Sequence, residues 1–163
     1  MFQPTRDEVR RFFCTAWQRH RAAQPLSPQE RSAVACILEH PEYHALLDDT
    51  ERALAHEFPV EDGRENPFLH LSMHLALIEQ ESIDQPPGIR AVLATLRQRQ
   101  GGRLGAAHDA ARGAAHEAAH EAMECLGEIL WRSQRGTLAP DMAIINQEYL
   151  DCLQRRASRV APG

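Results

Sequence analysis

Histidines spaced four residues apart are the part of this sequence best suited to chemistry. Residues at this spacing share one face of an α-helix, with Cβ atoms about 6 Å apart, and two imidazoles at that separation can bind one metal ion. The spacing therefore predicts metal-binding helix faces. Three pairs have it: His40 with His44, His70 with His74, and His116 with His120.

Two glutamates follow two of these pairs. Glu79 lies five residues after His74, and Glu124 lies four residues after His120. A helix rises 1.5 Å per residue, so two histidines and a glutamate span roughly 12 to 14 Å, too far for one ion. Three arrangements remain open. Two helices can pool their histidines around one ion, bridging glutamates can hold two ions, or the glutamates can orient the histidines without touching the metal.

The predicted ligands of the metal are four histidines, with two glutamates as bridging ligands or orienting groups. Imidazole and carboxylate donors suit a divalent transition metal, and zinc or iron is favoured over manganese or nickel. The residues of this predicted site are His70, His74, His116, His120, Glu79 and Glu124.

The remaining histidines carry weaker signals. Pro41 follows His40 and disfavours a helical conformation there, so His40 is expected to cap a helix and not to share a face with His44. Single histidines are usually hydrogen-bonded structural residues, which is the expectation for His20, His56 and His108. The roles of His40, His44 and His108 stay open at this point.

The stretch from His116 to His120 reads HEAAH and matches the HExxH motif of zinc proteases. It lies in an Ala-, Glu- and His-rich repeat, where such a match arises by composition. The extended form of the motif would need glycine at Met123 and histidine at Leu126. We therefore expect no protease activity; zinc-dependent cleavage of casein that Glu117→Gln abolishes would contradict this.

Helical periodicity and capping signals predict the elements that carry these residues. Serine, proline and glutamate at 27–30 form a capping box, and Asn66-Pro67 is a second start signal. No segment alternates as a strand does, so the sequence predicts an all-α bundle of about five to seven helices in one domain, 1–157, with a frayed tail, 158–163. The expected helices are 5–23, one opening at 27–30, 41–48, 50–57, one opening at 66–67, 87–100 and 142–156. An Ala-rich stretch from Leu104 is expected to lead into a further long helix that reaches about Arg135.

The two most apolar predicted helices are the one that begins at Asn66 and the one that ends near Arg135. Both are expected at the centre of the bundle, where axes of packed helices lie about 8 to 10 Å apart. Donor nitrogens around one ion lie roughly 3 to 3.5 Å from each other. We therefore expect one histidine of 70 and 74 to approach one of 116 and 120, with a glutamate, 79 or 124, in the same pocket.

Composition narrows the classes of function. The chain has 163 residues and a net charge of −5, and all 18 basic residues are arginine, so a general nucleic-acid binder is not expected. No apolar stretch reaches the roughly 20 residues of a membrane span, and the charged first thirteen residues are unlike a signal peptide. The cysteines and tryptophans are expected in the core, which fits a reducing cytoplasmic location. They are Cys14, Cys36, Cys125, Cys152, Trp17 and Trp131.

Several segments together resemble the bacterial family called domain of unknown function 1841. They read MFQPTRDEVRRFF, LSPQE, HPEYHALL, EDGRENPFLHLSMHLALIEQESIDQPPGIR and HEAMECLGEILW, and the resemblance covers residues 1 to about 135. It implies a helical protein of the bacterial cytosol and brings no activity with it.

Two hypotheses of function follow. The first is a metal-binding helical protein; enzyme activity is left open. The second is a non-enzymatic interaction domain with structural histidines, in which the Arg-rich first helix and the acidic segment from Asp48 to Glu65 bind a protein partner or a second copy of the chain.

Overall fold

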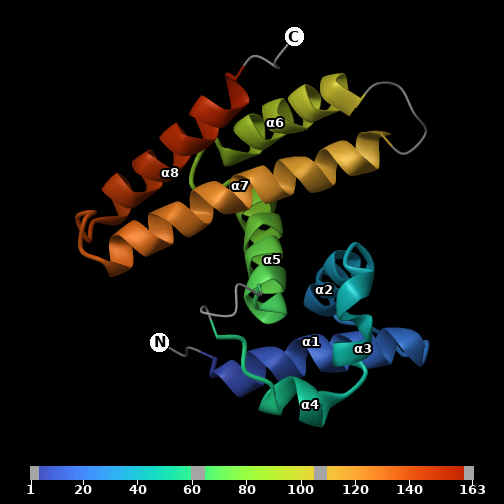
Figure 1. Ribbon diagram of the computed structural model, residues 1–163. Coiled ribbons are helices and arrows are strands. Elements are labelled where there is room, and N and C mark those ends of the chain that lie inside the picture. Colours follow the sequence, from blue (N-terminus) through green and yellow to red (C-terminus); the bar gives the residue numbers. More distant parts are fainter. Residues whose placement is uncertain (1–3, 60–64, 105–109, 160–163) are drawn as a thin grey trace. The chain divides into compact units, whose positions relative to one another are not determined.

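Helices make up the regular structure of this protein. The computed structural model describes residues 4–59, 65–104 and 110–159, and within these ranges there is no strand, which confirms the all-α prediction. The chain divides into two compact units, Met1–Leu75 and Ala76–Gly163, which are described separately. The elements are α1 (Arg6–Arg21), α2 (Pro28–Leu38), the 3₁₀ turn η1 (Pro41–Tyr43), α3 (His44–Leu47), α4 (Thr50–Ala55), α5 (Pro67–Ile83), α6 (Ile89–Leu104), α7 (Ala110–Gln134) and α8 (Met142–Ala157) (Figure 1).

Capping side chains set where the first helices begin. The Ser27 hydroxyl accepts a hydrogen bond from the backbone N–H of Glu30, and the Glu30 carboxylate accepts one from the backbone N–H of Ser27. This is the predicted capping box, which satisfies two N–H groups that the helix itself cannot bond. Thr5 and Glu8 form the same arrangement at the start of α1. Local sequence therefore fixes both helix starts.

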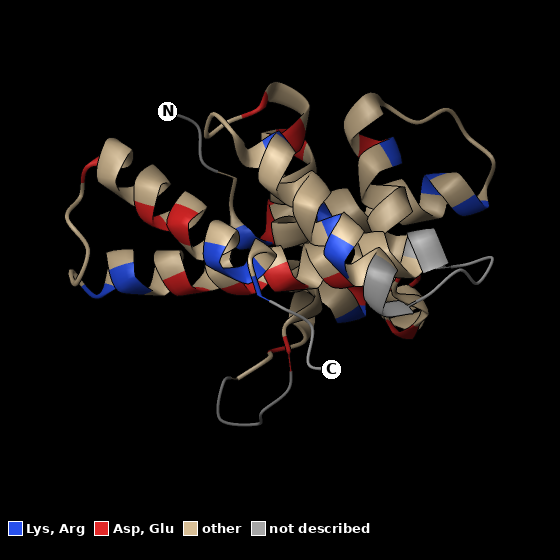
Figure 2. Ribbon diagram, turned by 90° about the horizontal axis from the view of Figure 1, so that it is seen from above, with Lys and Arg blue, Asp and Glu red and all other residues tan. Residues whose placement is uncertain are grey.

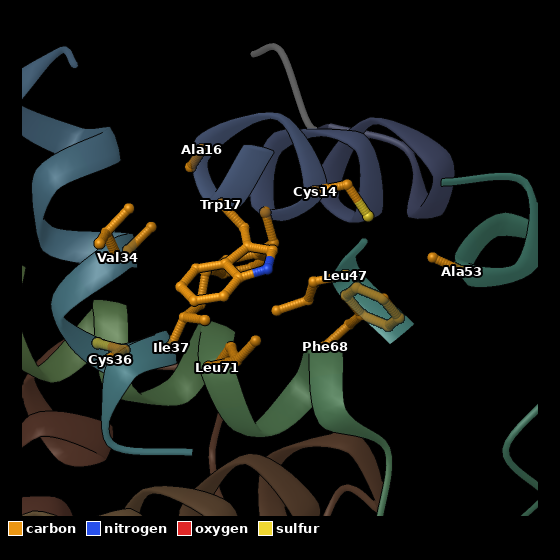
Figure 3. Packing of buried hydrophobic residues seen from close by; sticks show 12 residues of the cluster. Cys14, Ala16, Trp17, Val34, Cys36, Ile37, Leu47, Ala53, Phe68 and Leu71 are labelled. Carbon is orange, nitrogen blue, oxygen red and sulfur yellow. The ribbon is translucent and has the colours of Figure 1, made fainter. Parts of the chain in front are cut away.

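The core of the first unit packs α1 against α2, α3, α4 and the start of α5. Trp17 projects from α1 toward Ile37 and Leu71 (Figure 3). Phe13, Ala16 and Trp17, which stand at helical spacing on α1, are buried. The twelve buried residues of this core are Phe13, Cys14, Ala16, Trp17, Ala33, Val34, Cys36, Ile37, Leu47, Ala53, Phe68 and Leu71.

Arginines of α1 bind groups inside the same unit. Arg10 is buried and donates to the backbone carbonyls of Ala53 and His56, each at 2.7 Å. These carbonyls end α4, where a cation is favourable because helix C-termini carry partial negative charge. Arg21 pairs with Asp48 and Arg6 with Glu57. The hypothesis of an interaction domain expects the arginines of the first helix and the acidic segment 48–65 to bind a partner. In the structure several of these charges pair with each other within this unit.

Helix α5 begins at the predicted signal. The Asn66 side chain accepts hydrogen bonds from the backbone N–H groups of Phe68 and Leu69, at 3.0 and 3.3 Å. Such a cap satisfies donors of the first turn. The cap thereby holds the first turns of α5, which carry His70 and His74.

In the second unit α6, α7 and α8 pack along one another (Figure 1). Helix α6 continues through Gly101 and Gly102 to Leu104, so the predicted end at Gln100 is wrong. Glycine in a helix costs about 1 kcal/mol relative to alanine. A Cβ atom at Gly101 would lie 3.9 Å from that of Ala114 on α7, an ordinary van der Waals contact, so α6 continues through this glycine while packed beside α7.

The cysteines of the second unit are buried as predicted, whereas one tryptophan predicted in the core is not. Cys125 on α7 and Cys152 on α8 form a disulfide, with Cα atoms 5.8 Å apart, while Cys14 and Cys36 are buried free thiols as expected. Trp131, predicted in the core, is exposed with Arg135 over its ring. Residues two apart on a helix point about 200° apart, so burying Ile129 turns Trp131 outward.

Acidic and basic positions are interspersed along the described helices of each unit (Figure 2). Several pair within the second unit: Arg97 with Glu81, Arg99 with Glu121, and Arg132 with Glu148. Among the described residues, no helix combines the length and apolar character that a membrane crossing requires.

Candidate metal centre

His70 and His74 present their imidazoles from one face of α5, as their spacing predicts. Their Nε2 atoms lie 3.2 Å apart. The two residues are nearly inaccessible to solvent, with relative exposures of 8% and 7%. Buried polar groups need partners because burial removes their hydrogen bonds with water. The buried ring nitrogens of His70 and His74 must therefore interact with a metal ion, a proton or other polar groups.

His40 joins this pair from the end of α2. Pro41 forces a break after α2, and His40 has the non-helical backbone angles φ −128° and ψ 68°. Its Nδ1 lies 2.7 Å from the carbonyl oxygen of Cys36, in the last turn of α2. The side chain therefore does cap a helix, as expected. Its other ring nitrogen, Nε2, lies 2.9 Å from Nε2 of His70.

The three imidazoles converge on a small volume. Each offers a ligand nitrogen within 4.8 Å of those of the other two. Their ring planes meet at steep angles of 76°, 62° and 70°, with centroids 4.7 to 4.8 Å apart. The short Nε2 contacts of His70, 2.9 Å to His40 and 3.2 Å to His74, show that the ring edges carrying Nε2 meet. The three residues, His40, His70 and His74, are hereafter the imidazole triad.

Hydrogen bonds at the outer nitrogens fix the protons of two rings. The Cys36 carbonyl can only accept, so Nδ1 of His40 donates to it. The Glu65 carboxylate lies 2.6 Å from Nδ1 of His70 and also accepts. A neutral imidazole carries one N–H. In their neutral forms both rings therefore direct the lone pair of Nε2 toward the centre of the triad.

The surroundings of the triad keep its rings in place. The phenol ring of Tyr43 lies parallel to the His40 ring, 5.3 Å between centroids. Burial, together with the nearby carboxylates of Glu65 and Glu42, raises the pKa of Tyr43 to about 12. Burial raises the pKa of the Cys36 thiol to about 11. The Tyr43 phenol and the Cys36 thiol are therefore neutral near pH 7. The groups of this cluster that can bind a metal ion at that pH are the imidazoles.

His44 has a different role although it follows His40 by four residues. Its Nε2 lies 2.9 Å from the carbonyl oxygen of Ile37 and donates to it. Its ring stacks on Trp17 at 4.2 Å. Together His40 and His44 donate to two carbonyls at the end of α2, those of Cys36 and Ile37, which also accept backbone N–H groups of the turn that ends the helix. His44 is thus a structural histidine.

The other sequence-predicted site residues lie on elements of the second unit. His116 and His120 share a face of α7, with ring centroids 4.1 Å apart. Glu79 is exposed on α5, and the carboxylate of Glu124 forms an ion pair with Arg156. That these four residues share a site with His70 and His74 stays a prediction from the sequence. His108 lies outside the described residues.

Two residues of this cluster, His40 of the triad and Glu65 beside it, were not among the ligands that the sequence predicted. His40 is 30 positions from His70, and no helical period relates residues so far apart. Glu65 precedes the cap of α5, so the i, i+4 rule that selected Glu124 does not reach it. The available signals were weak ones: a histidine between a helix end and a proline, and a carboxylate five residues before a paired histidine.

Three imidazole nitrogens so placed can hold one divalent ion. Zinc binds imidazole nitrogen at about 2.0 to 2.1 Å, which puts tetrahedral donors roughly 3.3 Å from each other. The observed 2.9 and 3.2 Å are close to this value. A side chain in the fourth position would make a closed structural site, whereas water there would make the ion a Lewis acid.

Fold and side-chain geometry together define an all-helical protein with a buried cluster of histidines. The sequence profile of the family described as Domain of unknown function (DUF1841) matches residues 5–112 and 110–155. The chain belongs to this family. No curated protein and no solved structure matches it.

Proposed function

We propose that this protein binds one divalent transition-metal ion through the Nε2 atoms of His40, His70 and His74. The observation that carries the proposal is the short contact between Nε2 of His40 and Nε2 of His70, 2.9 Å. Both rings donate from Nδ1 to groups that only accept. Two neutral imidazoles in this arrangement direct lone pairs at each other, which is repulsive unless a cation lies between them.

A proton is the competing cation. It would turn one ring into an imidazolium and create an N–H···N hydrogen bond across the 2.9 Å contact. Burying a charge is costly because it leaves water, and Glu65 is the carboxylate bonded to the triad that offsets it. A metal ion instead engages all three nitrogens at once. A proton is shared by only two nitrogens, so the presence of a third imidazole, that of His74, favours a metal ion over a proton.

The donor set narrows the kind of ion. Magnesium and calcium take oxygen ligands, whereas imidazole suits zinc, copper, iron and nickel. Zinc and iron are the ions we expect. The ion joins the end of α2 to the start of α5, and it links two residues, His40 and His70, that are 30 positions apart in the sequence.

Elemental analysis tests this function. Protein purified without an affinity tag or added metal is expected to carry about one zinc or iron ion per chain, and His70→Ala with His74→Ala together to carry none. His116→Ala and His120→Ala, measured alongside, test the sequence-based prediction that this pair contributes a ligand. Wild-type protein free of metal even after incubation with zinc and iron(II) would refute the proposal.

A further inference from the structure

Glu65 lies beside the buried triad, just before α5. It directly precedes Asn66, whose side chain caps α5. Its carboxylate oxygen Oε1 lies 2.6 Å from Nδ1 of His70. The His70 side chain is 9% exposed and that of Glu65 is 64% exposed. Glu65 thus reaches a buried ring from the surface without being enclosed itself.

We infer that Glu65 is a positioning residue for the metal, acting through His70. This inference rests on the proposed function. A carboxylate that accepts the outer N–H of a ligating imidazole fixes its tautomer and ring orientation and makes the ligating nitrogen more basic. His70 is the ring in contact with both other members of the triad, so a rotation of His70 would disturb both short Nε2 contacts.

Two rings of the triad differ in the group that accepts their outer N–H, and this difference illustrates the role of Glu65. The outer N–H of His40 binds the neutral carbonyl of Cys36, and that of His70 binds a charged carboxylate. Hydrogen bonds to charged acceptors are shorter and stronger than those to neutral ones. Through this hydrogen bond Glu65 makes Nε2 of His70 a stronger ligand for a metal ion than Nε2 of His40. It also offsets part of the charge that a divalent ion brings into a buried site.

Cobalt(II) is a suitable probe because it occupies zinc sites and its visible spectrum reports the geometry of its ligands. We expect Glu65→Ala to raise the dissociation constant for Co²⁺ about 10- to 100-fold, the usual effect of losing such an outer partner. Glu65→Gln keeps an oxygen that accepts from Nδ1 but removes the charge, so its dissociation constant should lie between those of wild type and Glu65→Ala. The ligand-field band of Glu65→Ala should also change shape.

Glu51→Gln is the matched control. Glu51 is an exposed carboxylate in the first turn of α4, in the same unit, and its substitution removes the same charge. Its Co²⁺ affinity and spectrum should equal those of wild type. Circular dichroism of the metal-free variants checks that each one folds.

The outcomes separate this inference from the function it rests on. Wild-type protein that binds neither Co²⁺ nor Zn²⁺ refutes both. Wild-type protein that binds tightly, with Glu65→Ala and Glu65→Gln matching Glu51→Gln in affinity and spectrum, overturns the role of Glu65 alone. A graded loss from Gln to Ala, with an altered Co²⁺ band in the Ala variant, supports it.

Discussion

Replacing His40 by alanine is expected to raise the dissociation constant for Zn²⁺ or Co²⁺ by more than about 100-fold. Loss of an outer partner of a ligand costs about 10- to 100-fold, and His40 is itself one of three proposed ligands. Its Nε2 lies 2.9 Å from that of His70. The affinity is measured by competition with a chromophoric chelator at constant pH, because protons compete for the same nitrogens.

His44→Ala provides the matched control for His40→Ala. Both side chains donate to carbonyls at the end of α2, that of His40 to Cys36 and that of His44 to Ile37. Each variant therefore loses one cap of the same helix, which costs on the order of 1 kcal/mol. Only His40 directs its second nitrogen into the triad. Equal losses of affinity in the two variants would show that the effect is structural and that His40 is no ligand.

Removal of the ion by a strong chelator is expected to lower the melting temperature of the wild-type protein by about 8 to 16 °C. An ion present at 1,000 times its dissociation constant stabilises the folded state by about 4 kcal/mol. For a chain of this length each kcal/mol shifts the midpoint by roughly 2 to 4 °C. Differential scanning calorimetry with and without chelator measures the shift.

The control for this experiment is the double variant His70→Ala, His74→Ala. It should melt at the same temperature with and without chelator, because it no longer binds the ion that the chelator removes. A similar drop in the variant would point to an unrelated effect of the chelator. An unchanged wild-type curve, for protein shown to contain the ion beforehand, would mean that the ion does not stabilise the fold.

Sequence analysis succeeded where the determinants are local. Ser27 with Glu30, and Asn66 with Pro67, set helix starts through hydrogen bonds within one turn, and such signals are readable without the fold. The same holds for His70 and His74, whose common face follows from helical geometry alone. Their burial is also visible in sequence as two polar residues within an apolar helix.

Sequence analysis failed for features that depend on how the helices pack against one another. The helix that continues through Gly101 packs along α7, whereas propensity alone predicts a break there. The disulfide joins cysteines 27 residues apart on two helices, and only the packing of those helices brings them together.

The candidate site shows the same division. His40 enters it because the chain turns at Pro41 and returns as α5, which no spacing rule encodes. Glu65 acts from just outside α5, so its hydrogen bond to His70 depends on the path of the chain before the cap. The sequence thus predicts the chemistry of the site and two of its residues, and the fold supplies the third imidazole and the carboxylate.

Anomalous X-ray diffraction at the absorption edge of the bound ion tests the central claim most directly. Crystals of protein loaded with Zn²⁺ should show one anomalous peak about 2.0 to 2.1 Å from each Nε2 of His40, His70 and His74. A Nε2–Nε2 contact between His40 and His70 that persists in zinc-loaded crystals, with zinc absent from the triad, would contradict the claim.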